Sequence, residues 1–370
     1  MTSLRKRRWL WLLAAAVFFG AGAWLMSYGR PPVRRSVRQV SFPRGMDARA
    51  HERLERRQTL PRFTAGEPRP ARDEAEPKTE LGDPVIAAMP ARIERAAVVV
   101  EANALRHSPV GQMVVDCMLR ESGGHLDEAR QRLGFDFLED LDRVTFIDDT
   151  YLLSGFFEGA NWSQMFPGAT ATELGSKTTL WRTEGEPAMA VWNDQMVIAG
   201  KTEAEVMAVL DRLEGRAPRS LPPVMGENDS YGEIYGVVAP AAMAEVLRET
   251  HPQIADRLAT AVERLALHLD ASSDVGLVFD ASGKSAQAGD LGRMIGGALT
   301  VGQLTARARQ DDGLLAELLE HARVVPSEDG QSFRTELGLP LAFFEDLLRD
   351  CRFFRGSRQD SDGGPTNARQ

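Results

Sequence analysis

Cysteine, the residue type most able to form a covalent cross-link, occurs only twice in this chain, as Cys117 and Cys351. Structural zinc sites use four ligands in paired clusters, so two isolated cysteines predict no zinc site. Each cysteine falls on an apolar stripe at helical spacing, which favours two buried thiols that act as small hydrophobic side chains. A disulfide between them is the alternative, and an oxidising compartment would permit it.

The tripeptide Gly283-Lys284-Ser285 resembles the end of a phosphate-binding loop. That loop requires another glycine five residues before Gly283, and position 278 is Val278. We therefore interpret the tripeptide as a turn that closes a strand and opens a helix. No Gly-x-Ser-x-Gly nucleophile elbow is present, and the sequence predicts no cofactor.

Four carboxylates fall within seven residues, at Asp136, Glu139, Asp140 and Asp142. A calcium loop would alternate its oxygen ligands around a central glycine and end in a glutamate, and this pattern is absent. Apolar residues interleave with the carboxylates at helical spacing. The segment is therefore predicted to be a short amphipathic turn with a solvated acidic face, and not a metal site.

The histidines are scattered along the chain and none forms the helical pair of a zinc peptidase; those considered are His107, His125, His251, His268 and His321. His321 follows two glutamates at an expected helix end, where a histidine is favoured by the helix dipole. The sequence thus predicts no catalytic, cofactor-binding or metal-binding residue. A catalytic group assembled in space from distant residues stays open.

Aromatic residues concentrate between positions 156 and 192 and could line a pocket for an apolar ligand; they are Phe156, Phe157, Trp162, Phe166, Trp181 and Trp192. Aromatic side chains on strands more often belong to a core. The core interpretation is favoured.

Residues 9–29 form an uncharged stretch preceded by a basic run, Arg5 to Arg8. At about 1.5 Å per residue these 21 residues can cross a hydrocarbon layer of roughly 30 Å. A cleavable signal peptide would be shorter, and apolar residues continue after the only small-residue site, Ala21-Gly22-Ala23. We expect a transmembrane anchor that contacts membrane lipid, with residues 1–8 as a basic cytoplasmic tail and the body in the periplasm or otherwise outside the cytoplasm.

Residues 30–83 are rich in proline and arginine and poor in large apolar residues, so we expect a disordered linker. Its 54 residues would give a mean reach on the order of 40 Å. A short charged helix over residues 47–58 is the alternative for that part of it.

Charge is divided unevenly along the chain. Residues 1–83 contain 17 basic and 9 acidic residues, whereas residues 84–370 contain 27 basic and 44 acidic residues. An acidic body repels phosphate backbones, so no nucleic-acid partner is expected. The basic segment beside the expected anchor can instead attract anionic lipid headgroups.

The body is predicted to be α+β, with mainly antiparallel sheets. The order strand, helix, strand pair, helix, strands, helix occurs twice, which predicts two related subdomains at residues 84–217 and 224–354. They derive from an old duplication or pack as one continuous sheet. Residues 355–370 are polar and glycine-rich and are expected to form a disordered tail.

Three local signals are specific. Asp148-Asp149-Thr150 separates two apolar runs and predicts a strand pair, and Asn193-Asp194 predicts a tight hairpin turn. Thr202 and Glu205 form a capping box that starts a helix.

The stretch 134–144, Gly-Phe-Asp-Phe-Leu-Glu-Asp-Leu-Asp-Arg-Val, followed by Ser154-Gly155-Phe156-Phe157, resembles segments of uncharacterised bacterial envelope proteins. The resemblance covers about 25 residues, and those proteins set a single anchor or a lipoprotein signal before α+β repeats. It implies a location and no chemistry.

Three functional hypotheses follow. The first is a membrane-anchored envelope protein whose non-catalytic body binds a protein partner or an apolar ligand. The second is a membrane-tethered hydrolase with a site assembled in space. The third is a regulatory module that faces the cytoplasm.

Overall fold

The structure is a computed structural model that describes residues 40–61, 81–122, 124–166, 168–174, 177–183, 187–217, 221–308, 319–349 and 351. The expected anchor at residues 9–29, the tail at residues 1–8 and the tail at residues 355–370 lie outside these residues. Within the described part, no helix combines the length and the apolar character that crossing a membrane requires.

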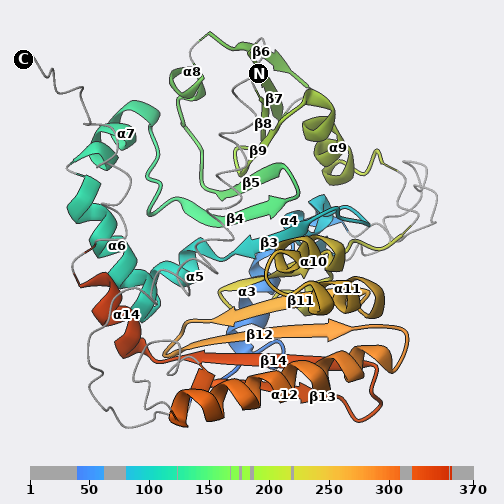
Figure 1. The fold of residues 1–370 in the computed structure, drawn as a ribbon. Coiled ribbons are helices and arrows are strands. Elements are labelled where there is room, and N and C mark those ends of the chain that lie inside the picture. The colour runs from blue at the N-terminus through green and yellow to red at the C-terminus, as the bar shows by residue number, and fades with distance from the viewer. Residues whose placement is uncertain are drawn as a thin grey trace, which may run out of the picture.

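Twelve strands form one antiparallel sheet (Figure 1). In chain order they are β3 (Ala96–Val100), β4 (Leu141–Ile147), β5 (Thr150–Gly155), β6 (Thr170–Glu173), β7 (Thr178–Arg182), β8 (Ala188–Trp192), β9 (Met196–Gly200), β10 (Ile234–Val238), β11 (Arg264–Asp270), β12 (Val275–Ser282), β13 (Ala322–Pro326) and β14 (Ser332–Leu339). Across the sheet they follow the order β13-β14-β12-β11-β10-β3-β4-β5-β9-β8-β7-β6. A separate small pairing joins β1 (Leu60–Pro61) to β2 (Leu81–Gly82).

Helices connect and cover these strands. Those described are α3 (Ala48–Arg57), α4 (Pro84–Ala88), α5 (Ala102–Arg106), α6 (Pro109–Ser122), α7 (His125–Leu133), α8 (Trp162–Met165), α9 (Glu203–Leu213), α10 (Pro240–Arg248), α11 (Pro252–Ala261), α12 (Gln287–Ala308) and α14 (Leu341–Leu348). The α+β class and the antiparallel sheet are therefore as predicted.

The sheet continues across the two predicted subdomains, because β3 from one pairs with β10 from the other. At the centre of this pairing, Gly236 lies opposite Val98. A Cβ atom at Gly236 would come within 2.3 Å of the Ala97 carbonyl oxygen. A glycine is thus needed where the two halves of the chain meet.

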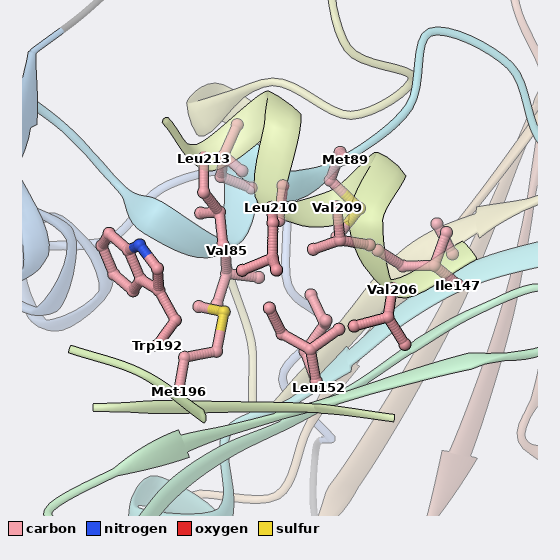
Figure 2. Close-up of a cluster of buried hydrophobic side chains, with 14 of the residues drawn as sticks. Val85, Met89, Ile147, Leu152, Trp192, Met196, Val206, Val209, Leu210 and Leu213 are labelled. Carbon is pink, nitrogen blue, oxygen red and sulfur yellow. The ribbon is translucent and has the colours of Figure 1, made fainter. Parts of the chain in front are cut away.

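One face of the sheet, here called the back face, carries alternate residues such as Val99 of β3 and Tyr235 of β10. Helices α4 and α9 pack on it and form the largest buried cluster, part of which is drawn in Figure 2. The apolar stripe of α9 supplies Val206, Val209 and Leu210, all almost completely buried. The core of this half of the sheet therefore lies between α9, α4 and the strands.

The opposite face, here called the front face, carries the other alternate residues, such as Val238 of β10. Helices α10, α11 and α12 cover it around Leu258, Leu265 and Leu291. Helices α7 and α8 pack on it near Phe157 and Val197. Both faces of the sheet are therefore used for packing.

The local turn signals are confirmed. Asp148 adopts a left-handed backbone with φ of 50° between β4 and β5, and its carboxylate accepts hydrogen bonds from the backbone of residues 94–96. Asn193 and Asp194 both have positive φ in the turn between β8 and β9. The Thr202 and Glu205 capping box is formed at the start of α9. Each signal depends on neighbours in sequence, which is why the sequence predicted them.

The expectation of disorder over residues 30–83 is wrong for the described residues 40–61 and 81–83. The alternative, a charged helix, is correct: Asp47 caps α3 through a 2.6 Å hydrogen bond from the Ala50 amide. Ala50 and Leu54 are buried, and Arg57 forms ion pairs with the body. Composition predicted a linker because the partners of this segment are distant in sequence.

The favoured interpretation of the cysteines as two thiols is also wrong, because Cys117 and Cys351 form a disulfide. Cys117 lies on α6 and Cys351 follows α14, and both are buried. The two apolar stripes pack against each other and bring the sulfur atoms together. The alternative considered from the sequence is therefore the one that the structure contains.

Candidate functional site

The Gly283-Lys284-Ser285 tripeptide, which resembles the end of a phosphate-binding loop, is a turn between β12 and α12, as the sequence predicted. Gly283 follows β12, and α12 begins four residues later. Lys284 is exposed and pairs with Glu263, with 2.8 Å between Nζ and Oε1. The lysine is therefore paired with a glutamate immediately before the neighbouring strand β11.

The acidic segment forms a turn held by its own carboxylates. Asp136 accepts a hydrogen bond from the Leu138 amide at 2.8 Å, and Asp140 accepts one from the Asp136 amide at 2.7 Å. Asp142 points elsewhere and pairs with Arg57 at 2.9 Å. Among the described residues, no group of three or more potential metal ligands converges.

The histidines do not meet. The exposed His107 contacts the Asn103 carbonyl, and His125 lies 3.5 Å from Glu128 on its own helix. His268 alone is deeply buried, stacked on Tyr231 with ring centroids 3.7 Å apart. Burial lowers the pKa of His268, so the neutral imidazole is favoured. His251 is the N-cap residue of α11 and His321 precedes β13, far apart in the chain.

The aromatic residues considered as a pocket divide between different places. Phe157 and Trp162 pack with Phe135 on the front face, whereas Trp192 belongs to the back-face core. Phe166 lies beside Trp181, and Phe156 is 76% exposed. Three of the six, Phe157, Trp162 and Trp192, belong to buried clusters, and the six residues do not lie together in one place.

The structure contains a buried polar cluster that sequence reasoning missed. We define the central polar cluster as Arg57, Asp83, Glu101, Asp142, Arg143 and Tyr235. These residues come from α3, the N-cap of α4, the end of β3, the start of β4 and β10. The cluster therefore lies where the two halves of the sheet join.

Arg143 and Asp83 form its most buried pair, with Nη1 donating to Oδ2 at 2.6 Å. Burial by itself disfavours the charged guanidinium, but Asp83, Tyr235 and Glu101 together outweigh it, and the pKa of Arg143 is raised. The other Asp83 oxygen accepts from the Val85 amide at 2.8 Å and caps α4. One carboxylate thus fixes both a helix start and a buried cation.

Glu101 links the rest of the cluster. Its Oε1 accepts a 2.7 Å hydrogen bond from the Tyr235 hydroxyl and a 2.8 Å bond from Arg57. Its Oε2 lies 2.7 Å from the same guanidinium nitrogen but outside hydrogen-bond geometry. Burial and the Glu101 charge raise the pKa of Tyr235 well above its usual range.

This chemistry is suited to holding parts of the chain together. A tyrosine whose pKa is raised remains neutral, and a paired arginine does not give up its proton. Neither group is poised to accept a proton near neutral pH. The sequence signal that could have revealed the cluster is Arg143, a charged residue at the same inward-facing spacing as Thr145 and Ile147 on β4.

The front face carries a feature that is more accessible. Val98, Phe146, Tyr151 and Ala199 lie directly opposite one another across β3, β4, β5 and β9. We call these four residues the apolar row. None is buried, Tyr151 is 39% exposed, and the Phe146 and Tyr151 rings meet edge to face at 5.5 Å between centroids.

Charged residues border the apolar row at the ends of the same strands. Asp149 pairs with Arg95 at 2.9 Å and also with Lys201. These cations lower the pKa of Asp149 although partial burial opposes the shift. An apolar centre with aromatic rings and a charged rim is the usual anatomy of a protein interface.

No family model, no curated protein and no solved structure matches this chain.

Proposed function

We propose that this chain is a membrane-anchored envelope protein of bacterial type whose body binds a protein partner through the apolar row. Residues 9–29 serve as the anchor and contact membrane lipid. The body lies on the periplasmic or otherwise extracytoplasmic side. Binding, and not catalysis, is the activity of the body.

The apolar row, in which Tyr151 is exposed and the other three side chains are only half-buried, is the observation that carries the proposal. Soluble bodies bury most large apolar side chains, and contiguous exposed ones mark interaction sites. Tyr151 and Phe146 supply rigid aromatic area of the kind that dominates binding energy. The Arg95, Asp149 and Lys201 rim supplies the charged border.

The disulfide between Cys117 and Cys351 supports the compartment. Disulfides persist in oxidising compartments and are rare in the bacterial cytoplasm. Its buried position ties α14 to α6, so the bond belongs to the folded body.

A photo-cross-linking residue placed at Tyr151 in intact membranes tests the proposal. Phe156 is the matched control, because it is an exposed aromatic residue beyond the other end of β5. We expect a discrete adduct with one protein from position 151 and none from position 156. The adduct should disappear when Ala199, which lies opposite Tyr151, is replaced by arginine. Equal adducts from both positions, or none from 151, would reject the apolar row as the interface.

A further inference from the structure

Residues 40–58, here called the N-terminal strap, lie on the back face of the sheet, along the strand ends where β14 and β3 end and β12 and β4 begin. The strap begins over β14 and β12 and ends beside β3 and β4, and Figure 1 draws α3 behind the sheet. These strand ends lie on one side of the sheet, because antiparallel pairing places the end of β14 beside the start of β12. It therefore crosses the junction of the two halves.

Two glycines seat the start of the strap. Gly276 and Gly338 are direct partners in the β12 and β14 pairing. A Cβ atom at Gly276 would lie 2.5 Å from the Ser41 carbonyl oxygen, and one at Gly338 would lie 3.0 Å from the Val40 side chain. The nearest atoms at both glycines belong to the strap. A side chain at either position would therefore occupy the space that the strap takes up.

Polar contacts bind the rest of it. Arg323 lies over the Phe42 ring at 5.5 Å, and Arg53 donates to the Gly232 carbonyl at 3.3 Å. Arg57 ends the strap in the central polar cluster with ion pairs of 2.7 and 2.9 Å. The strap is thus attached at its start, middle and end.

This attachment changes the length of the tether. If the membrane segment ends at Gly29, only residues 30–39 separate it from Val40. Ten residues span at most about 35 Å when fully extended. The long linker predicted from composition would have let the body move far from the membrane, and the bound strap prevents that.

Charge agrees with a position close to lipid. Residues 30–58 contain nine arginines and three acidic residues, while the body beyond residue 83 is acidic. Within the strap, Arg44, Arg49 and Arg56 are exposed, but so are its three acidic residues, so the excess positive charge comes from the four arginines of residues 30–38 and from two arginines that contact the body. Basic residues near an anionic membrane surface are attracted to it.

We infer that the strap holds the adjoining edge of the sheet against the anionic headgroups of the membrane. This inference rests on the proposed anchor. Phe146 and Tyr151, the two central residues of the apolar row, lie toward the opposite ends of the strands, because β4 ends and β5 begins beside them. The strap therefore presents the proposed binding site away from the lipid.

Energy transfer from the protein to labelled lipid headgroups tests this. Donor labels are placed by non-canonical amino acids at Ser273 and at Lys284, exposed positions at the two ends of β12. The full chain is reconstituted in vesicles of phosphatidylethanolamine and phosphatidylglycerol. We expect clearly higher transfer from position 273, and equal transfer from both positions would overturn the inference.

Displacing the strap provides the second arm. Gly276→Val should remove the difference between the two labels and increase amide exchange over residues 48–57. Gly297→Val is the matched control, because a Cβ at Gly297 meets nothing within 4 Å. If Gly276→Val does not fold, Gly338→Val applies the same test, and unchanged transfer in a folded variant would contradict the role of the strap.

The two proposals fail in different ways. A chain that does not co-sediment with vesicles lacks the anchor, and both proposals then fall. A chain that binds vesicles with equal transfer from both labels keeps the anchor and loses the strap inference alone.

Discussion

Arg143 and Asp83 form an ion pair with 2.6 Å between Nη1 and Oδ2, and both side chains are almost completely buried. The pair joins β4 to the start of α4, which packs against α9 over the largest core. Breaking such a pair on one side leaves a buried charge without its partner. The relationship therefore allows a direct test of what the central polar cluster contributes.

Asp83→Asn removes the charge and retains a residue type that can cap α4. We expect it to lower the free energy of unfolding by about 3–5 kcal/mol, measured by urea denaturation. Glu203→Gln is the control, because its ion pair with Arg182 is exposed and should contribute less than about 1 kcal/mol. Equal losses in the two variants would contradict a special role for the buried pair.

Tyr235→Phe removes the hydroxyl that donates to Glu101 at 2.7 Å. The buried carboxylate then loses a donor, and we expect a loss of roughly 1–3 kcal/mol in unfolding free energy. Tyr151→Phe makes the same chemical change at an exposed position and should have little effect. A loss at Tyr235 no larger than the one at Tyr151 would mean that Glu101 is satisfied by Arg57 alone.

Stability should depend on pH through His268. Its pKa is lowered by burial from 6.5, although Asp280 and Asp229 oppose the shift and Arg264 adds to it. The unfolded chain therefore takes up a proton first as the pH falls. Stability contributed by the neutral imidazole is complete above about pH 6.5 and is lost as the pH falls through the lowered pKa.

Thermal unfolding of wild type and His268→Gln across this range measures the effect. The melting temperature of wild type should fall more steeply below pH 6.5 than that of the variant. His107→Gln, at an exposed position, should follow wild type. Burial raises the pKa of Glu233 from 4.5, so its contribution to stability falls as the pH rises above 4.5, opposite to that of His268. The test is therefore the difference in melting temperature between wild type and His268→Gln, and not the slope of either protein alone.

The disulfide should stabilise the body substantially, because it closes a loop between residues 234 positions apart. Cys117→Ser with Cys351→Ser is expected to lower the unfolding free energy by about 2–5 kcal/mol. Alkylation of the denatured, unreduced protein followed by mass measurement should find no free thiol. Modification of both cysteines under those conditions would show that the bond is not formed.

Local sequence signals predicted the elements well. The Asn193-Asp194 turn, the Thr202 and Glu205 capping box and the strand pair around Asp149 each depend on residues a few positions apart. Their physical causes, left-handed backbone tolerance and satisfaction of free amides, act within that distance. The sequence alone therefore determined the α+β class and these local elements.

Only the tertiary structure decided which distant residues meet. Cys117 pairs with Cys351, Arg57 reaches Glu101, and the strap lies on Gly276, although none of these partners is close in sequence. Composition predicted that residues 30–83 cannot form a core by themselves. The described part is ordered because the sheet supplies the apolar contacts and the counter-charges that the segment lacks.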